Sequence, residues 1–415
     1  MTTETTGTTE LRVLGAADWE SWYRSLEWAF GGGFEPAEER AAWREVTEFD
    51  RSFALWDKDR IVGSFSSFSF QLSVPGGTQV PAAGVTMVHV APTHRRQGQL
   101  RRMMRAGLDA VRDAGEPLAV LTASEPAIYG RFGYGVASHV LDATLDIART
   151  GLRLPPGTED VRLSLADPAD VMDRCEELYA RLVPARPGMI VRRPAWRGMI
   201  LLDAPAARGG ASPRRCLLAE RDGELVGYAR FATTARWEAT VPDGTVLVKD
   251  LDAADPAAYA AMLRFLMELD LMSTVRLPNR PVDDALLHLV SDQRRSRLRV
   301  FDRLHLRPVD VGAALAARAY AADVDVVLDV TDAFCPWNGG TWRLSGGPGG
   351  AVCERTGDAP DLALDVRELG AAYLGGTSLA SLAAAGLVRE LRPGALTAAA
   401  TAFSSPVAPW LPHAF

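Results

Sequence analysis

Lysine is almost missing from this chain of 415 residues, because Lys58 and Lys249 are its only two and every other cationic side chain is an arginine. The 52 acidic residues outnumber the 45 lysines and arginines, which leaves a formal net charge of −7. A net-negative chain without lysine-rich runs lacks the basic stripe that binds nucleic acid. We therefore expect no nucleic-acid partner, whereas a positively charged substrate would be tolerated.

Cysteine and histidine are also scarce. The six histidines are scattered, and the four cysteines include no Cys-x-x-Cys pair; they are Cys175, Cys216, Cys335 and Cys353. Structural zinc sites and disulfide scaffolds need clustered or regularly spaced cysteines and histidines. We expect reduced, buried thiols and no metal cofactor.

Long apolar runs are absent as well. No uncharged stretch approaches the roughly 20 residues that a membrane-spanning helix needs, and the first residues lack the basic and apolar regions of a signal peptide. We expect a cytoplasmic protein without a membrane partner. What is present, 47% hydrophobic and 23% charged residues, is typical of a soluble globular protein, and the length predicts two to three domains.

A mixed α/β unit occurs twice along the chain. The first copy is expected to contain a strand hairpin, a strand, a helix and a strand, over 52–74, 85–90, 100–114 and 117–122. The second copy shows the same order, over 216–231, 245–251, 256–271 and 274–277. A linker rich in proline and glycine starts at Leu154 and separates the two copies.

From about Arg303 alanine and glycine become more frequent, and strands alternate with short helices again. The pattern predicts strands near 325–331 and 340–344 and helices near 365–374 and 378–385. We therefore expect three domains, 1–153, 154–302 and 303–415. The fold class is α/β with mixed sheets.

The segment from Val88 to Leu100 is the most informative in the chain. A strand leads into a turn with Arg95, Arg96 and Gly98, and a helix follows. The first backbone N–H groups of a helix lack internal partners and attract an anion, which can approach closely where a glycine has no Cβ. Without the Gly-Lys-Ser/Thr of a nucleotide-binding loop, this cradle suits coenzyme A better than ATP. An ordinary basic helix start is the alternative.

Two further features suit the same chemistry. Pro92 closes the preceding strand, so the strand amides around Val88–Val90 can stay free for a pantetheine arm. In the loop after the next strand, Tyr129 stands four residues before Gly133. A phenol with a pKa near 10 is protonated at pH 7 and can donate a proton to a departing thiolate. A packed core tyrosine is the alternative for Tyr129, and the better interpretation of Tyr134.

These motifs resemble the GCN5-related N-acetyltransferase (GNAT) superfamily over residues 85–135. Over the whole chain the sequence is similar to the enhanced intracellular survival (Eis) acetyltransferases of actinobacteria, through Val-Ala-Pro-Thr-His-Arg-Arg-x-Gly and Ile-Tyr-Gly-Arg-Phe-Gly-Tyr-Gly. Residues 362–366 and 373–376 resemble a sterol carrier protein fold. The resemblance implies two tandem GNAT domains, of which only the first binds acetyl-CoA, a C-terminal sterol-carrier-protein-like domain, and a homo-oligomer, namely a hexamer.

The resemblance also assigns roles to residues. It implies acetyl-CoA contacts for Val88, His89, Val90, Arg95, Arg96, Gln97, Gly98, Gln99, Leu100, Arg101, Ser124 and Glu125. Tyr129 would be the proton donor, and the α-carboxylate of Phe415 the proton acceptor. No charged residue follows Arg392, so the apolar tail is expected to dock into the protein. A terminal carboxylate is a weak base, and His413 and Glu125 remain its rivals.

The function expected from these features is direct acetyl transfer from acetyl-CoA to an amine of a polycationic small molecule, such as an aminoglycoside, or of a lysine side chain. Two alternatives remain: acyl transfer to a peptide or aminoacyl substrate, and a non-catalytic lipid-carrier or interaction protein. In the second copy, acidic residues of segment 250–255 stand where the first copy has its arginines and glycine. Because these carboxylates repel a pyrophosphate, we expect the second site to be inactive.

Overall fold

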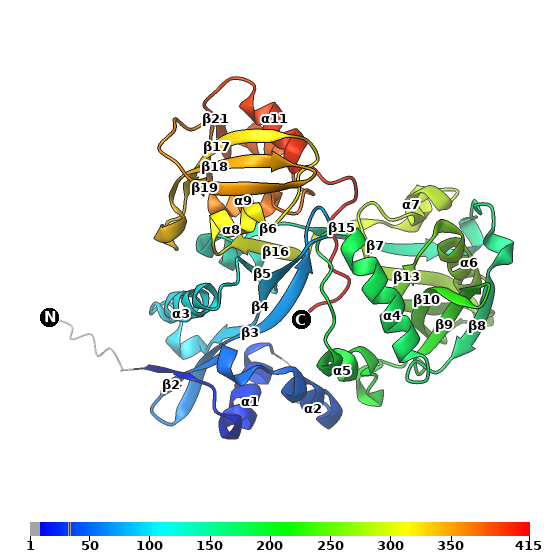
Figure 1. Ribbon diagram of the computed structural model, residues 1–415. Coiled ribbons are helices and arrows are strands. Elements are labelled where there is room, and N and C mark those ends of the chain that lie inside the picture. Colours follow the sequence, from blue (N-terminus) through cyan, green and yellow to red (C-terminus); the bar gives the residue numbers. More distant parts are fainter. Residues whose placement is uncertain (1–8, 32, 34) are drawn as a thin grey trace. The chain divides into compact units, whose positions relative to one another are not determined.

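The computed structural model describes residues 9–31, 33 and 35–415, and the chain divides into two compact units. Unit 1 contains the described part of 1–137, together with Leu304–Ser405 and Phe415; unit 2 contains Ser138–Arg303 and Pro406–Ala414 (Figure 1). The chain therefore enters unit 2 after Ala137, sixteen residues before the boundary expected at 153. The linker composition near 154 marks a loop but does not reveal which sheet the preceding strand joins.

Unit 1 is built on a seven-stranded sheet with the order β1-β2-β3-β4-β5-β16-β6. Its strands are β1 (Glu10–Val13), β2 (Ser52–Asp57), β3 (Arg60–Ser73), β4 (Gln79–Val90), β5 (Leu118–Thr122), β6 (Gly135–Val136) and β16 (Leu304–Pro308). β16 pairs antiparallel with both β5 and β6. β16 follows residues 138–303 of unit 2 in the sequence, yet it completes the seven-stranded sheet of unit 1.

Three helices cover this sheet: α1 (Trp19–Ala29), α2 (Ala37–Val46) and α3 (Gln99–Asp113). Along β2, Leu55 packs into the core cluster of α3, while its neighbour Ala54 packs into the cluster of α1. Because successive strand residues face opposite sides, these two helices cover opposite faces of the sheet. α3 approaches closely at Gly107, where a Cβ atom would meet the Phe65 ring at 2.2 Å.

The rest of unit 1 is a five-stranded sheet with the order β19-β18-β17-β20-β21. Its strands are β17 (Val324–Thr331), β18 (Gly340–Gly347), β19 (Gly350–Arg355), β20 (Leu362–Asp365) and β21 (Val388–Glu390), and its helices are α8 (Val311–Ala316), α9 (Val366–Ala372), α10 (Leu379–Ala384) and α11 (Ala395–Phe403). β17, β18, α9 and α10 lie where the sequence predicts two strands and two helices, whereas β19, β20, β21, α8 and α11 were not predicted.

Unit 2 contains a second seven-stranded sheet, with the order β15-β7-β14-β13-β10-β9-β8. The strands are β7 (His139–Asp146), β8 (Arg162–Ala166), β9 (Arg215–Arg221), β10 (Glu224–Thr234), β13 (Gly244–Ala253), β14 (Met272–Pro281) and β15 (Arg299–Asp302); β11 (Trp237–Glu238) and β12 (Val241–Pro242) form a small hairpin. The helices are α4 (Met172–Leu182), α5 (Arg197–Leu201), α6 (Pro256–Met267) and α7 (Leu286–Leu289).

The two large sheets repeat one feature. β4 pairs in parallel with β5 only over Ala82–Gly84, and β13 pairs in parallel with β14 only over Gly244–Leu247. Beyond these short ladders the two strands of each pair run on without pairing to each other. The repeat predicted from the sequence is confirmed, and with it the mixed α/β class. Across the described ranges, no helix has the length and apolarity needed to cross a bilayer.

Candidate active site

β4 and β5 separate at the centre of the unit 1 sheet. Their ladder ends at the pair Gly84–Val120, yet β4 continues to Val90. β4 also bulges here, where its pairing register with β3 shifts between Ser64 and Ser66. At the bulge Met87 has a left-handed backbone, with φ 53°, and its carbonyl accepts a hydrogen bond from the Ser64 hydroxyl. A bulge bends a strand and takes backbone groups out of the ladder. The result is an open strand edge leading toward the start of α3.

A cavity of about 640 Å³ lies along this edge. It is lined by Val88, Val90, His94, Arg95, Arg96, Gly98, Gln99, Leu100, Arg101, Glu125, Ile128, Arg131 and Phe132. The structure therefore brings both sequence motifs to one cavity. Sequence reasoning missed His94, Ile128, Arg131 and Phe132, although all four lie inside the two motifs and follow from the strand–loop order. His89, Gln97 and Ser124 are not among the lining residues.

The cavity ends at the first turn of α3. Gly98 caps this helix with φ 79°, and a Cβ atom added there would meet nothing in the described chain within 4 Å. The first helical hydrogen bond runs from the Arg102 N–H to the Gly98 carbonyl, at 3.0 Å. The N–H groups of residues 99–101 therefore come before the helical ladder and are available to an anion.

The loop before α3 is held in shape by its own side chains. Arg95 donates from Nε to the Val90 carbonyl at 3.3 Å, and the Gln97 amide donates to the Thr93 carbonyl at 3.2 Å. Arg96 has a left-handed backbone, with φ 63°. These contacts give Gln97 a structural role, while the guanidinium groups of Arg95 and Arg96 remain beside the cavity.

His89 faces away from the cavity. Since side chains alternate along a strand, His89 lies on the opposite face of β4 from Val88 and Val90. Its Nε2 atom is 3.0 Å from the Ser25 hydroxyl oxygen on α1. Burial, and then the positive charge of Arg95, lower the pKa of His89 to about 4. The ring is therefore neutral at pH 7 and has no side-chain contact with the cavity.

Tyr129 lies in the 3₁₀ segment Pro126–Phe132, directly after β5. Its half-buried ring packs edge-on against Tyr134, with 6.1 Å between ring centroids. Burial, and then the nearby Glu125 carboxylate, raise the pKa of Tyr129 above its ordinary value. The phenol therefore carries its proton at pH 7. Tyr129 is not itself a residue that lines the cavity, but its neighbours Ile128 and Phe132 line it. Tyr134 is a core residue, as predicted.

Phe415 lies at the point where β4 and β5 separate. Its ring packs edge-on against Phe70 at 4.8 Å between centroids, and a Cβ atom at Gly84 would come within 3.1 Å of it. The Thr122 hydroxyl donates a long hydrogen bond, 3.5 Å, to the backbone oxygen of Phe415. The last residue is thus fixed between the end of the β4–β5 ladder and the end of β5.

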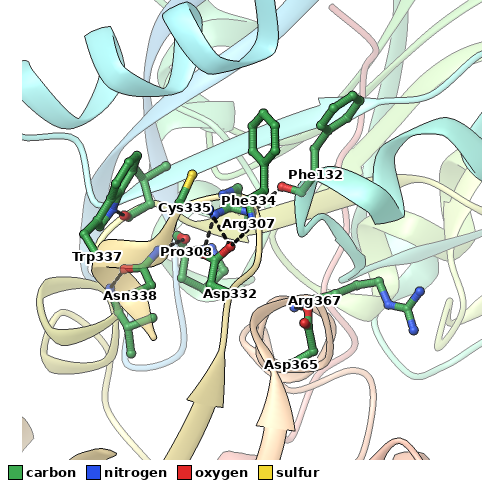
Figure 2. A network of polar contacts seen from close by, with 12 residues as sticks. Phe132, Arg307, Pro308, Asp332, Phe334, Cys335, Trp337, Asn338, Asp365 and Arg367 are labelled. Atoms are coloured by element: carbon green, nitrogen blue, oxygen red, sulfur yellow. Dashed lines mark hydrogen bonds and ion pairs between the residues drawn. The ribbon is translucent and has the colours of Figure 1, made fainter. Parts of the chain in front are cut away.

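A buried network of polar contacts holds the 3₁₀ segment Pro126–Phe132, called the Tyr129 segment below, through the carbonyl of Phe132 (Figure 2). Arg307 of β16 is completely buried; it donates to the Phe132 carbonyl and forms an ion pair with Asp332, which follows β17. The Asn338 amide donates to the same carboxylate at 3.0 Å. Gly133 has φ 82°, and a Cβ atom there would collide with the Arg307 guanidinium. The C-terminal part of unit 1 therefore fixes the segment that carries Tyr129.

The corresponding place in unit 2 holds a smaller cavity, of about 350 Å³, and charged side chains surround the start of its helix. Asp255 caps α6 by accepting from the Ala258 N–H at 2.9 Å, and it pairs with Arg221 at 2.8 Å. Arg280 donates to the Leu251 carbonyl of β13 at 2.8 Å, between the diverging strands. A carboxylate thus takes the position of the anion at this helix start. The segment expected as an acidic loop is instead the end of β13 and the cap of α6.

Comparisons with known proteins agree with this architecture. Family models described as an acetyltransferase (GNAT) domain match residues 10–137 and 188–308, and a sterol carrier protein domain model matches residues 311–412. An uncharacterized N-acetyltransferase of Streptomyces avermitilis is 62% identical over 408 residues, 98% of this chain and 100% of the relative. N-acetyltransferase Eis of Mycobacterium tuberculosis is 33% identical, over 94% and 95%. The crystal structure of Eis1 from Mycobacterium abscessus matches with a TM-score of 0.84 and 32% identity, over 98% and 100%.

Proposed function

The chain belongs to the Eis family of N-acetyltransferases, and from this premise we propose that acetyl-CoA is its acetyl donor, bound in the cavity of unit 1. One observation carries the proposal: the open edge of β4 and the glycine-capped start of α3 line the same cavity of about 640 Å³. An extended pantetheine arm suits the first feature, and a pyrophosphate suits the second. When bound, acetyl-CoA would supply the acetyl thioester.

The charges around the cavity fit that ligand. Arg95, Arg96, Arg101 and Arg131 line it, against a single carboxylate from Glu125. Guanidinium groups bind phosphate oxygens through two parallel N–H donors. Together with the free N–H groups of the first helical turn, they form an anion cradle that uses neither lysine nor a metal ion.

Tyr129 is the proposed proton donor. Its pKa is raised by burial and by Glu125, so it is protonated over the whole neutral range. A donor of this kind typically accelerates the reaction by about 10²–10⁴-fold. The Arg307 network holds the segment that bears it, and so keeps the phenol in place without taking part in the chemistry.

The α-carboxylate of Phe415 is the proposed proton acceptor. Phe70 and Thr122 hold this residue where β4 and β5 separate. Of its two rivals, Glu125 is exposed, and burial together with Arg192 lowers the pKa of His413 well below its ordinary value. A histidine in such surroundings has little affinity for a proton and is therefore no stronger a base than the carboxylate, and the position of Phe415 beside Phe70 and Thr122 supports the carboxylate.

The proposed acceptor is a primary amine of a polycationic small molecule or of a lysine side chain, consistent with the net charge of −7. The amine must be neutral when it attacks, so one ammonium proton passes to the carboxylate. As the C–N bond forms the C–S bond of the thioester breaks, and the departing thiolate receives a proton from Tyr129. The second proton, which the nitrogen loses on becoming an amide, returns to the Tyr129 phenolate. A homo-hexamer is part of the proposal, on the strength of the family resemblance, and light scattering of the purified protein tests it.

A binding and turnover experiment tests the donor site. We expect the double variant Arg95→Ala/Arg96→Ala to bind coenzyme A at least tenfold more weakly in isothermal titration, and to release thiol from acetyl-CoA more slowly with an amine acceptor. The matched control is Arg294→Ala/Arg295→Ala, an exposed arginine pair in unit 2, which should behave as wild type. Wild-type protein that binds a fatty acid but no coenzyme A would instead establish the lipid-carrier alternative.

A further inference from the structure

We infer that Phe334 is a positioning residue for the donor site, whose ring orients Arg101 for the phosphates of acetyl-CoA. Phe334 lies in the part of the chain that the sterol carrier protein domain model matches. The inference rests on the proposed function, because it concerns the affinity for the proposed donor. It gives the C-terminal part of unit 1 a role in binding acetyl-CoA, in addition to the proposed base at Phe415.

Arg101 lies in the first turn of α3 and lines the cavity of unit 1. Its side chain is exposed and forms no hydrogen bond or ion pair with any described residue. Its Cζ atom lies over the Phe334 ring, 5.2 Å from the centroid. A guanidinium group within about 6 Å of a ring centroid is attracted by the negative face of the ring. The Phe334 ring therefore restricts the positions that the Arg101 guanidinium adopts.

A contact with a ring face leaves the donors of an arginine available. Arg95 and Arg131 each use Nε on a backbone carbonyl, at 3.3 and 2.9 Å. The five N–H groups of Arg101 are used by no described residue, and they lie in the guanidinium plane, where they match phosphate oxygens. A side chain that is already held loses less conformational entropy when it binds a ligand. Phe334 therefore favours phosphate binding by Arg101 without competing for its donors.

The same ring supports a second residue of the cavity. Phe334 packs edge-on against Phe132, with 5.0 Å between the ring centroids, and Figure 2 shows the two rings next to each other. Phe132 lines the cavity, as Arg101 does. One ring from the C-terminal part of unit 1 thus contacts a lining residue from each of the two sequence motifs.

Phe334 is itself held firmly. It is 3% exposed, and its backbone N–H donates to the Asp332 carboxylate at 3.1 Å. The Cys335 N–H donates to the same oxygen at 2.8 Å, and the other oxygen of Asp332 pairs with Arg307. These contacts, drawn in Figure 2, fix the loop that bears the ring. A residue that orients another must have a fixed position of this kind.

A second ring of the same loop offers a matched comparison. Arg105 and Arg112 share one face of α3 with Arg101, because they follow it after four and then seven further residues. Trp337 lies against Arg105 and Arg112, at 5.4 and 4.5 Å, whereas the described chain shows no such contact between Trp337 and Arg101. Neither Arg105 nor Arg112 lines the cavity. Removing the Trp337 ring therefore loosens the packing of this loop on α3 without a direct effect on the anion cradle.

Isothermal titration with coenzyme A and steady-state kinetics of the full chain test the role of Phe334. Phe334→Leu and Phe334→Met keep a buried apolar side chain but remove the ring. We expect both variants to raise the dissociation constant for coenzyme A and KM for acetyl-CoA roughly two- to fivefold, the effect of losing an exposed cation–π contact, with little change in kcat. Phe334→Tyr, which keeps the ring, should restore wild-type affinity.

Two controls separate positioning from a general loosening of the loop. Trp337→Leu should lower the melting temperature but leave the affinity for coenzyme A unchanged. In a chain that already carries Arg101→Ala, Phe334→Leu should weaken binding no further, because the ring acts through Arg101. A lower kcat with unchanged KM would show instead that Phe334 acts through Phe132 and the Tyr129 segment, and would overturn the proposal.

The wild-type titration distinguishes the two levels of the argument. Wild-type protein that binds no coenzyme A would refute the proposed function and this inference together. If the wild type binds coenzyme A and Phe334→Leu binds it equally well, only this inference fails. Equal weakening by Trp337→Leu and Phe334→Leu would have the same meaning.

Discussion

Arg307 and Asp332 form an ion pair whose side chains are 0% and 1% exposed. The pair joins β16 to the end of β17, and the same guanidinium donates to the Phe132 carbonyl of the Tyr129 segment (Figure 2). A buried pair is costly to form, but removing one member is far worse, because the other charge is left unpaired in a dry site. This relationship makes the position of the Tyr129 segment dependent on the C-terminal part of unit 1.

Replacing Arg307 should therefore destabilise the protein strongly. We expect Arg307→Met to lower the free energy of unfolding by about 3–5 kcal/mol, measured by urea denaturation. The control is Arg343→Met, which breaks the exposed pair of Arg343 and Asp325 and should change little, because solvent screens such pairs. Similar losses in the two variants would show that the buried pair has no special weight.

Removing the phenol of Tyr129 should slow the chemical step. We expect Tyr129→Phe to lower kcat by about 10²–10⁴-fold and to leave the affinity for coenzyme A unchanged. Because the pKa of Tyr129 is raised, the wild-type rate should not fall on the alkaline side until the pH exceeds 10. Tyr134→Phe, which removes a buried hydroxyl from the neighbouring ring, is the control; a full-rate Tyr129→Phe enzyme would reject the donor assignment.

Moving the carboxylate away from Phe415 should abolish turnover. Two residues added after Phe415 leave its ring against Phe70 but replace the carboxylate by a peptide group. We expect kcat to fall at least 10²-fold, the lower end for a general base, with an unchanged thermal melting curve. The same two residues added before Met1 serve as the control. Retained activity of the extended chain would reject the carboxylate of Phe415 as the base and favour His413 instead.

The glycine at the start of α3 should matter for binding rather than only for folding. Gly98→Ala places a side chain in a left-handed backbone, at a cost of roughly 1 kcal/mol, and puts a methyl group into the anion cradle. Gly394, the cap of α11, has φ 86° and equally open surroundings. Both variants should lose similar stability, but only Gly98→Ala should raise KM for acetyl-CoA. An equal KM in both would mean that no anion approaches Gly98.

His89 should make the folded protein sensitive to acid. Its pKa is about 4 when folded, against an ordinary 6.5, so the unfolded chain binds the extra proton between these values. Stability attributable to this residue is complete above pH 6.5 and is lost as the pH falls through 4, by about 3 kcal/mol. Urea denaturation at several pH values measures it, and His89→Gln should show a flatter profile. An unchanged profile would mean that other groups dominate.

The elements that line the cavity of unit 1 could be predicted from local sequence, because each depends on nearby residues. Turn residues and hydrophobic periodicity predict the positions of three elements: the strand before Arg95, the helix after Gly98 and the segment around Tyr129. Each lies at the predicted position. Nothing local could show that the bulge at Met87 depends on Ser64, or that Arg307 reaches Phe132. Such contacts join residues far apart in the sequence and depend on the pairing of strands. For the same reason the expected boundary at 153 differs from the point where the chain enters unit 2.

The position of β16 has a consequence for synthesis. The first sheet needs residues 304–308 between β5 and β6, so a nascent chain must carry β5 with an unpaired edge while all of unit 2 is still being made. Exposed strand edges are templates for aggregation. Unit 2 is therefore able to complete its sheet first on the ribosome, although unit 1 begins first, and a chaperone that shields the waiting edge would raise the yield of folded protein.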